Sequence, residues 1–568
     1  MQTRRAFIGT TAAVAALSLA PARAAAAGPV RLSLAAFSGD PKKAAALRRG
    51  IAAMKALPAS DHRSYFFQAA THAYSDALLK AEIKRDPKLK AVDKARYWNK
   101  CPHFGQCSAD FVIWHRAYLH FFERTLRAAA QDETLALPYW DYTKPEQRTF
   151  PAIYAPEFLD DAKKQLNPLF HPNREKAFVK GTLEISALIG LAEKTVGAAT
   201  FFHQTGAPGF AGDDLDEDHT QVGLLEQRPH NDIHVAVGGV INSSNGAMAE
   251  ITTAAFDPVF WVHHANVDRM WAQWAGTAGK SWGKGPAAAW FDEKPWRFLD
   301  ADGSEVRVSR REAIGLLAAY DVDYPGQLAV PLAAPVAPPA PPPPRDEKPG
   351  AAAPGGGSGN ADRAVATGAA PPVVVAAAAP PRLGAAPPRH PTERELVADH
   401  TPMIVTPHNS GRRLFGEPPP GLAHSGGMQQ SRGGGAAMPV LNAPELSNPN
   451  AKVLLELNDI MFKLVPSSGF AVYLDAPGRP AGDPVGLIDI FGATHHGAGM
   501  NSTDMDMPGM HHMKAAQRFD VTNIVRKNGG PYTVRIEAYD LLVAKDGTAP
   551  RSRADGVQIG AVRFVVIS

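Results

Sequence analysis

A proline-rich stretch divides this chain of 568 residues into two parts with different sequence patterns. Residues 331–390 contain 16 Pro, interleaved with runs of Ala and Gly. Such a stretch cannot bury enough apolar surface to offset the conformational entropy lost on ordering, so we expect a flexible linker with polyproline character. Because the residues that follow lack a regular pattern, we predict that the linker extends over residues 331–440.

The part before the linker carries the pattern of amphipathic helices. Apolar residues recur at steps of three and four, which is the period of one helix face. The clearest patterns lie at residues 41–57, 61–79, 108–130 and 257–274. Since strand signals between them are few, we predict a mainly α-helical domain over residues 25–330.

The part after the linker has a different period. From residue 451 apolar and polar residues alternate in short runs, including VLLELND, GFAVYLDAP, RFDVTNIV and VQIGAVRFVVIS, with turn residues between them. Alternation with a period of two is typical of half-buried strands. We therefore predict a small antiparallel β domain over residues 441–568.

The N-terminus has the pattern of an export signal. An arginine pair at residues 4–5 precedes a short apolar run, and an A-x-A cleavage pattern follows at residues 22–24. The run is too short for a membrane span, and the apolar FI after the arginines resembles a twin-arginine signal. An ordinary secretory signal is the alternative. In both cases we expect residues 1–24 to be removed and the mature protein to be periplasmic or secreted.

Charge and cysteine content exclude several classes of protein. The 59 Lys and Arg against 56 Asp and Glu leave a formal charge of +3, too balanced for a nucleic-acid binder or a polybasic membrane ligand. Two cysteines cannot form a disulfide scaffold or a cysteine-ligated zinc ribbon. Histidine, with 20 residues, is the abundant metal-binding side chain.

Two histidines four residues apart form the first candidate metal motif. His230 and His234 lie in RPHNDIHVAVGG, with Pro229 at an expected first helical position. Residues at i and i+4 share a helix face, so both imidazoles can reach one ion. Asn231 stands where a zinc protease carries its general-base Glu, which excludes that motif.

A second motif, DPVFWVHHANVDRMW, adds a histidine pair. Asp257 and Pro258 are expected to start a helix, and His263 and His264 follow. Adjacent residues on a helix point about 100° apart, so only one of the two can bind an ion while the other packs beside it or lines a substrate pocket. Asp268, one turn after His264, can accept the second ring N–H of a ligand or hold a neighbouring arginine.

A third set of histidines comes earlier in the chain. His115 lies in the aromatic-rich FVIWHRAYLHFFE, His72 in the similar FFQAATHAYSD, and His103 in a loop between them. Each alone is also explained by packing. Together with the later motifs they supply two sets of three imidazoles, which suits a pair of transition-metal ions, with copper first in the affinity order.

These motifs resemble those of a known family. FVIWHRAYLHFFE and DPVFWVHHANVD resemble the two copper signatures of the tyrosinase, polyphenol oxidase and hemocyanin family, and LPYWDY, PHNDIHVAVGG and HHANVDRMW stand in the family's order. The resemblance covers about residues 60–325, and KPWRFLDADGSEVRVSRREA is similar to the end of the plant-type catalytic region. It implies a four-helix bundle around a dicopper centre.

The resemblance also implies a ligand set. Position by position it assigns copper A to His72, His103 and His115, and copper B to His230, His234 and His264, with His263 as the non-ligand of its pair. Seven residues separate His103 from Phe111, where the family has four or five, so we expect an insertion near residues 105–108.

The two cysteines lie in the same stretch. Cys101 and His103 resemble the C-x-H of fungal relatives, in which the sulfur is bonded to the imidazole as a thioether. Cys107 offers Cys101 a disulfide partner instead, and both alternatives stay open.

The family's reaction is the oxidation of o-diphenols to o-quinones with O2 as co-substrate, preceded in tyrosinases by ortho-hydroxylation of monophenols. Small phenols are therefore the expected partners. Glu226 and Asn231 resemble the water-holding pair proposed for monophenol activity, although a polar pair at a helix start is an equal explanation. A catechol or o-aminophenol oxidase without monophenol hydroxylation, or a hemocyanin-like O2 carrier, is the alternative.

In plant and fungal relatives the C-terminal domain covers the copper entrance and keeps the enzyme latent, so we expect the same of residues 441–568.

A loop at residues 495–513 adds possible Cu(I) ligands, because thioethers and imidazoles are soft donors. They are His495, His496, Met500, Met505, Met507, Met510, His511, His512 and Met513. We expect transient copper binding there, with a solvated loop as the alternative.

Overall fold

The computed structural model describes most of the chain outside its N-terminus and the proline-rich stretch. The described residues are 29–102, 107–213, 221–241, 244–319, 321–322, 393–406, 410–415, 447–462, 468–476, 483–491, 511–512, 516–528, 530–545 and 556–567. All of them belong to one compact unit. The predicted signal peptide lies outside the described residues. Among the helices that the structure describes, none is both long and apolar enough to cross a membrane.

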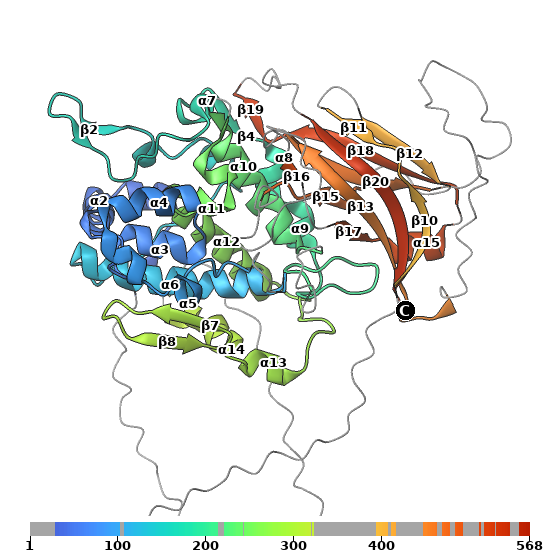
Figure 1. The fold of residues 1–568 in the computed structure, drawn as a ribbon, viewed down its shortest axis with the longest axis horizontal. Helices are drawn as coiled ribbons and strands as arrows, with labels where there is room; N and C mark the ends of the chain where they lie inside the picture. Colours follow the sequence, from blue (N-terminus) through green and yellow to red (C-terminus); the bar gives the residue numbers. More distant parts are fainter. Residues whose placement is uncertain are drawn as a thin grey trace, which may run out of the picture. The chain divides into compact units, whose positions relative to one another are not determined.

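Four helices that carry histidines form the centre of the helical part (Figure 1). They are α3 (Tyr65–His72), α6 (Asp110–Ala130), α10 (Asp232–Gly238) and α12 (Val259–Gly276). Helix α6 packs against α12 and against α2 (Pro41–Ala56). The ring of Phe122 in α6 stacks on that of Trp261 in α12, with ring centroids 3.4 Å apart. Both helices are apolar on most of their circumference, which is typical of helices in the centre of a bundle.

Shorter elements surround this bundle. The helices are α1 (Leu34–Ser38), α4 (Asp76–Arg85), α5 (Lys94–Tyr97), α7 (Lys176–Val179), α8 (Ala187–Leu191), α9 (Glu193–Gly197), α11 (Ile251–Ala254), α13 (Ala288–Asp292) and α14 (Arg310–Gly315). The paired strands are β1 (Val30–Arg31) with β9 (Asp321–Val322), β2 (Phe158–Asp160) with β3 (Gln165–Leu166), β5 (Val240–Ile241) with β6 (Ser244–Asn245), and β7 (Trp296–Leu299) with β8 (Glu305–Val308).

The predicted helices at 41–57, 108–130 and 257–274 are confirmed as α2, α6 and α12. The pattern at 61–79 instead divides into α3 and α4. Helix α3 stops because Ala73 takes an extended backbone, and the hydroxyl of Ser75 accepts the N–H of Leu78 at the start of α4. A serine cap of this kind begins a new helix and interrupts a pattern that reads as continuous.

The C-terminal part is built from two antiparallel sheets, as predicted (Figure 1). One sheet has the order β10-β20-β13-β16, with β11 on β20 and β17 on β13, and the other has the order β12-β18-β14-β15. The strands are β10 (Glu393–Asp399), β11 (Met403–Val405), β12 (Gly411–Phe415), β13 (Lys452–Phe462), β14 (Ser468–Asp475), β15 (Gly486–Ile488), β16 (His511–His512), β17 (Gln517–Asp520), β18 (Tyr532–Asp540) and β20 (Val557–Ile567).

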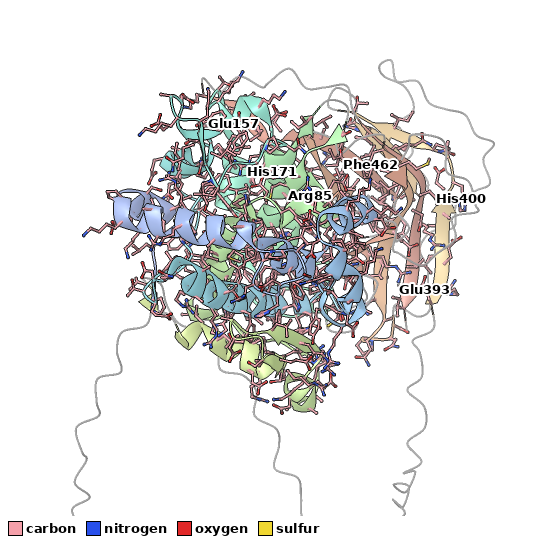
Figure 2. The ribbon with its side chains drawn as sticks, turned by 60° about the vertical axis from the view of Figure 1, so that its left-hand side comes forward. Arg85, Glu157, His171, Glu393, His400 and Phe462 are labelled. Carbon is pink, nitrogen blue, oxygen red and sulfur yellow. The ribbon has the colours of Figure 1, made fainter. Side chains whose placement is uncertain are left out.

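Two expectations for the C-terminal part were wrong. The predicted linker is too long, because β10, β11 and β12 lie between residues 393 and 415 and pair with β20 and β18. Strand β10 is the edge of its sheet, with Glu393 at its start and His400 just past its end (Figure 2). The run RFDVTNIV is a strand only to Asp520, whose carboxylate accepts the N–H of Thr522 and starts helix α15 (Thr522–Lys527).

The helical and sheet parts are joined by a strand pair. Strand β19 (Leu542–Ala544) follows β18 and pairs antiparallel with β4 (Leu183–Ile185) of the helical part. A second contact lies at Gly206, whose backbone N–H donates to Asp520 Oδ2 at 2.8 Å and whose carbonyl accepts from Asn523 at 3.1 Å. The C-terminal residues are therefore hydrogen-bonded to the helical part at separate points.

A buried cluster of four charged side chains ties the N-terminal strand β1 to α6 and α12. Arg31 donates two hydrogen bonds to Glu123, at 2.6 and 3.2 Å, and one to Asp268 at 2.7 Å. Arg116 donates to the other oxygen of Asp268 at 2.6 Å. Two cations thus balance two anions, and the side chains of all four are at most 2% exposed. Removing one member would leave an uncompensated charge in the interior.

We predict that Arg31→Gln lowers the free energy of unfolding by about 3–5 kcal/mol, because Glu123 and Asp268 would lose a shared buried partner. The matched control is Arg124→Gln, since Arg124 pairs with Asp300 at the surface and a pair of this kind contributes about 0–1 kcal/mol. Urea unfolding followed by tryptophan fluorescence measures both. Equal, small losses would contradict the role given to the buried cluster.

Candidate metal centre

Two clusters of buried side chains in the four-helix centre have donor atoms close enough to hold a metal ion. In each cluster the potential ligand atoms lie within 4.8 Å of one another. The first consists of His230, His234, His263 and His264, and the second of His72, Cys101 and His115. Five of the six histidines proposed as ligands are thereby brought together, and the sixth, His103, lies outside the described residues.

A kinked helix positions His230 and His234. The short helix η4 (Glu226–Asn231) is interrupted at Arg228, whose backbone is extended, and regular helix resumes at Pro229 and continues through α10. Pro229 therefore stands in a first turn, where its missing N–H has no helical partner to lose, as predicted. The helix ends at Gly239, whose φ of 60° favours glycine.

Hydrogen bonds to Nδ1 decide which ring nitrogen of His234 and His230 carries the proton. His234 Nδ1 lies 2.9 Å from the carbonyl oxygen of Met248, and His230 Nδ1 lies 2.6 Å from Asn231 Oδ1. Because carbonyl oxygens only accept, both Nδ1 atoms must donate. In a neutral imidazole the other nitrogen, Nε2, then carries a lone pair, which is the form that binds a metal ion.

These lone pairs converge on His264. The Nε2 atoms of His230 and His234 each lie 3.3 Å from Nε2 of His264. Burial lowers the pKa of His234 and His264 well below the ordinary value, so these rings are neutral. A proton on His264 Nε2 can be donated to only one of the other two Nε2 atoms and leaves the other lone pair without a donor. A cation among the three atoms satisfies all of them, so the residues fit a bound metal ion.

His263 has different contacts from its neighbour. Its Nδ1 lies in hydrogen-bonding contact with the hydroxyl of Tyr142 at 3.2 Å, and its ring stacks on His230 with centroids 5.3 Å apart. Burial lowers the pKa of His263 to about 3. Tyr142 belongs to the LPYWDY motif, so the sequence held a signal for this partner. Of the pair, His264 places its Nε2 3.3 Å from the Nε2 atoms of both His230 and His234, but His263 belongs to the same cluster of potential ligands. That His264 is the ligand and His263 packs beside the site stays a prediction.

The second cluster adjoins the first. His115 Nδ1 donates to the carbonyl oxygen of Phe111 at 2.7 Å, which again makes Nε2 the free lone pair. The sulfur of Cys101 lies 4.0 Å from this Nε2. The His115 ring stacks on His264 with centroids 4.3 Å apart and planes 15° apart. Ions held by the two clusters would therefore be neighbours.

The cysteines do not form the disulfide considered above. Cys101 and Cys107 are both buried, and no disulfide joins them. The thiol of Cys107 donates to Asp110 Oδ2 at 3.2 Å, and burial together with this carboxylate raises its pKa, so it stays protonated. The disulfide alternative is wrong for this structure. The thioether alternative requires His103 and stays a prediction.

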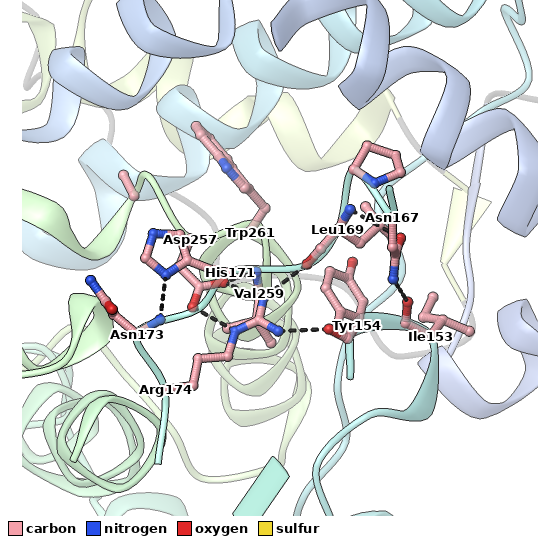
Figure 3. Close-up of polar contacts among 12 residues, drawn as sticks. Ile153, Tyr154, Asn167, Leu169, His171, Asn173, Arg174, Asp257, Val259 and Trp261 are labelled. Atoms are coloured by element: carbon pink, nitrogen blue, oxygen red, sulfur yellow. Dashed lines mark hydrogen bonds and ion pairs between the residues drawn. The ribbon is translucent and has the colours of Figure 1, made fainter. Parts of the chain in front are cut away.

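An arginine holds the start of α12. Arg174 donates to both oxygens of Asp257, at 2.7 and 2.8 Å, and to the carbonyl oxygens of Tyr154 and Leu169 (Figure 3). Asp257 in turn accepts the N–H of Val259 at 3.0 Å, which confirms its predicted place at the helix start. Sequence analysis missed Arg174, because nothing in the local pattern links a loop residue to a helix 83 positions later.

Asp268 serves the second of the two roles expected of it. Its oxygens accept from Arg31 and Arg116, as described above, so the expectation that it holds an arginine is confirmed. The alternative, that it accepts a ring N–H of a ligand, is wrong. His264 Nδ1 has no hydrogen-bond partner among the residues that the structure describes.

Glu226 and Asn231, the predicted water-holding pair, are both buried in the short helix beside His230. Asn231 uses its oxygen to accept from His230, and its amide nitrogen is a buried donor with no hydrogen-bond partner among the described residues. An amide donor of this kind is suited to bind a water or a substrate oxygen. The role of Glu226 and Asn231 in holding a water stays a proposal.

Sequence analysis also missed an aromatic residue from the C-terminal part. Phe491 follows β15, and its ring stacks on His234 with centroids 4.0 Å apart and planes 22° apart. It also meets His230 edge to face at 5.6 Å. The run VGLIDIFG predicts only a strand, so no sequence signal places this ring on the histidines.

The predicted copper-binding loop lies almost entirely outside the described residues. Only His511 and His512 are described, as β16, which pairs with Met461 and Phe462 of β13. Copper binding by this loop remains a prediction.

The helical part of the chain is similar in sequence to tyrosinases and polyphenol oxidases. Residues 62–185 and 192–277 match the model of the common central domain of tyrosinase. A tyrosinase of Hahella sp. (strain CCB-MM4) is 30% identical over 283 residues, covering 46% of this chain and 57% of the relative. A chloroplastic polyphenol oxidase of Vitis vinifera is 32% identical over 297 residues, covering 50% and 46%. The chain thus spans about half the length of the curated relatives it matches. The solved structure of latent apple tyrosinase is 19% identical, with a TM-score of 0.49 over 96% of this chain and 98% of that one.

We predict that His264→Ala lowers bound copper by about one equivalent per chain, because it removes the atom on which the other two lone pairs converge. His263→Ala, one residue away and equally buried, is the matched control and should keep both equivalents. Metal analysis of the purified variants after dialysis against a weak chelator measures this. Loss of copper from His263→Ala but not from His264→Ala would reverse the assignment within the pair.

Proposed function

Because the chain belongs to the tyrosinase and polyphenol oxidase family, we propose that it is a type 3 copper oxidoreductase that uses O2 to oxidise o-diphenols to o-quinones and ortho-hydroxylates monophenols. The bound copper pair would supply the redox chemistry that couples phenol oxidation to the reduction of O2. Five of the six proposed ligands are described, and His103 is proposed as the sixth from the family motif alone.

The observation that carries the proposal is the convergence of imidazole Nε2 atoms in two adjoining clusters. The Nε2 atoms of His230 and His234 each lie 3.3 Å from Nε2 of His264. The ring of His115 stacks on that of His264 and so connects the two clusters. A single ion would need only one cluster. Two neighbouring clusters of neutral nitrogen donors suit a pair of copper ions, since imidazole is a favoured ligand of copper.

The chain's own residues have three tasks in this proposal. Nδ1 hydrogen bonds fix the rings of His115, His230 and His234, and the buried walls exclude water from the site. Glu226 and Asn231 hold a water that takes the proton of an incoming phenol. An unperturbed phenol has a pKa near 10, so this proton must be removed for a monophenol to react at neutral pH.

Initial rates on catechol and on tyramine under air, with quinone formation as the readout, test the reaction. The proposal expects turnover of both. Turnover of catechol alone would indicate a catechol or o-aminophenol oxidase. Retained copper with no quinone from either would indicate an O2 carrier.

We predict that Asn231→Ala lowers kcat/KM on tyramine by about 100-fold, the low end of what a positioned acid or base contributes. Catechol oxidation should change far less, because a diphenol does not depend on the same early proton removal. Asn266→Ala is a suitable control, since Asn266 is also buried and its side-chain oxygen accepts from Arg269 rather than from a histidine. Equal losses of Asn231→Ala on both substrates would mean that the residue only orients His230.

We also propose that the uncut chain is latent, meaning that its C-terminal part hinders access of phenols to the histidines. The position of Phe491 supports this proposal. Its ring lies face to face on the His234 imidazole, and we propose that it occupies the space through which the ring of a phenol would approach that side of the site. The segment is held there by the β4 and β19 pair and by the contacts at Gly206. As long as these contacts persist, substrate and Phe491 compete for the same space.

We predict that Phe491→Ala raises the rate of catechol oxidation by the uncut chain several-fold, because it removes the competing ring. Cleavage of the chain between residues 331 and 392 should raise it further by allowing the C-terminal part to leave. The control is Ile404→Ala, a truncation of an exposed side chain in β11 of the C-terminal part. Unchanged activity after both the substitution and the cleavage would contradict latency.

We make two further proposals, one for the N-terminus and one for the loop at residues 495–513. We propose that residues 1–24 direct export by the twin-arginine route to the periplasm or beyond, which suits a protein that binds its metal before transport. We also propose that the loop at residues 495–513 binds Cu(I) and passes it to the site.

A further inference from the structure

One tyrosine of the C-terminal part makes a contact with helix α10 that a free phenol could also make. Tyr539, in β18, donates its hydroxyl hydrogen to Asp232 Oδ1 at 2.7 Å. Asp232 begins α10, between the two ligand candidates His230 and His234. Its second oxygen accepts from Arg228 Nε at 2.8 Å. The hydroxyl of Tyr539 thus meets a carboxylate that the protein already holds in place.

The ring of the same tyrosine is recognised as well. The guanidinium of Arg228 lies over the Tyr539 ring, 4.4 Å from its centroid, which is a cation–π contact. Arg228 is also the residue whose extended backbone interrupts the helix. Its Nη2 is buried and has no hydrogen-bond partner among the described residues. Asp232 and Arg228 together therefore recognise both halves of a phenol, the hydroxyl and the ring.

A cavity of about 810 Å³ opens beside this contact. Arg228 and Tyr539 line it, together with Tyr473 of β14 and with Leu188 and Leu224 of the helical part. Tyr539 is only partly buried, because the cavity reaches it. The volume is within the range of sites that hold small organic ligands, and the walls are mostly apolar with a few polar groups.

We propose that Asp232 and Arg228 form a second phenol-binding site, at which free phenols replace Tyr539 and so loosen the C-terminal part from helix α10. This inference rests on the proposed function, which makes phenols the substrate class. The ligand is a neutral phenol, because Asp232 requires a hydrogen-bond donor and Arg228 is already balanced by Asp232. Substrate would thereby promote its own access to the site that Phe491 covers.

The chemistry of Tyr539 agrees with such an exchange. Burial, followed by the charge of Asp232, raises the pKa of Tyr539, so its hydroxyl stays protonated and acts as the donor. A small phenol offers the same donor and the same ring without the attached strand. Because Tyr539 is held on the same chain, its effective concentration is of the order of millimolar or higher, and competing phenols must reach similar concentrations.

Hydrogen exchange of the full-length copper protein under nitrogen tests the proposal. Without O2 no phenol is turned over, so the result does not depend on the proposed oxidase activity. The probes are 4-methylphenol and 4-methylanisole at millimolar concentration, which share a ring but differ in the hydroxyl donor. We expect 4-methylphenol to speed exchange in residues 532–544 several-fold and 4-methylanisole to leave it unchanged.

Two tyrosine variants locate the effect. Tyr539→Phe removes only the hydroxyl, so exchange in residues 532–544 should already be faster without ligand and should gain nothing from 4-methylphenol. Tyr473→Phe is the matched control, because Tyr473 lines the same cavity but has its ring under Arg535, and it should respond as the parent does. An unchanged parent, an equal response to both probes, or a full response of Tyr539→Phe to 4-methylphenol would overturn the proposal. The last result would place the phenol at the dicopper centre instead.

Discussion

The rest of the structure depends on one electrostatic constraint, the meeting of imidazole lone pairs at the centre of the bundle. His230 and His234 each donate through Nδ1 to a fixed carbonyl oxygen, so their Nε2 atoms can only accept where they meet His264. Such an arrangement is unfavourable in an empty, dry interior and favourable around a cation. The surrounding architecture must therefore hold the rings in a geometry that their mutual contacts alone would not maintain.

Arginine and carboxylate pairs supply that support. Arg31 and Arg116 meet at Asp268 and fix α12 against α6 and the N-terminal strand. Arg174 holds Asp257, where the same helix begins. Buried ion pairs are weak evidence for stability, but they give a strong preference for one arrangement, because any slip leaves a charge without a partner. They join segments far apart in the sequence, and two of these segments, α6 and α12, carry His115 and His264, one histidine of each cluster.

The sequence was informative where the signal is local. Helical periodicity identified α2, α6 and α12, and the i, i+4 spacing identified His230 and His234 as partners. The break at Ala73 between α3 and α4 was not predicted, since a serine cap and an extended residue leave the apolar pattern intact. Strands β10 to β12 were not predicted either, because they are short and adjoin a Pro-rich stretch. Only their pairing with distant strands stabilises them. The positions of Arg174, Phe491 and Tyr539 depend on tertiary contacts, which no single-sequence pattern encodes.

The C-terminal part contacts the histidine-bearing segment around α10 directly. It places Phe491 on His234 and Tyr539 on Asp232, two residues apart on one helix. The central claim remains the paired metal sites on which these contacts act. A crystal structure of the copper-loaded full-length chain, with anomalous scattering recorded on both sides of the copper edge, tests it most directly. The account predicts two neighbouring copper peaks, one among the Nε2 atoms of His230, His234 and His264 and one beside His72 and His115. A single peak, or copper bound away from both clusters, would contradict it.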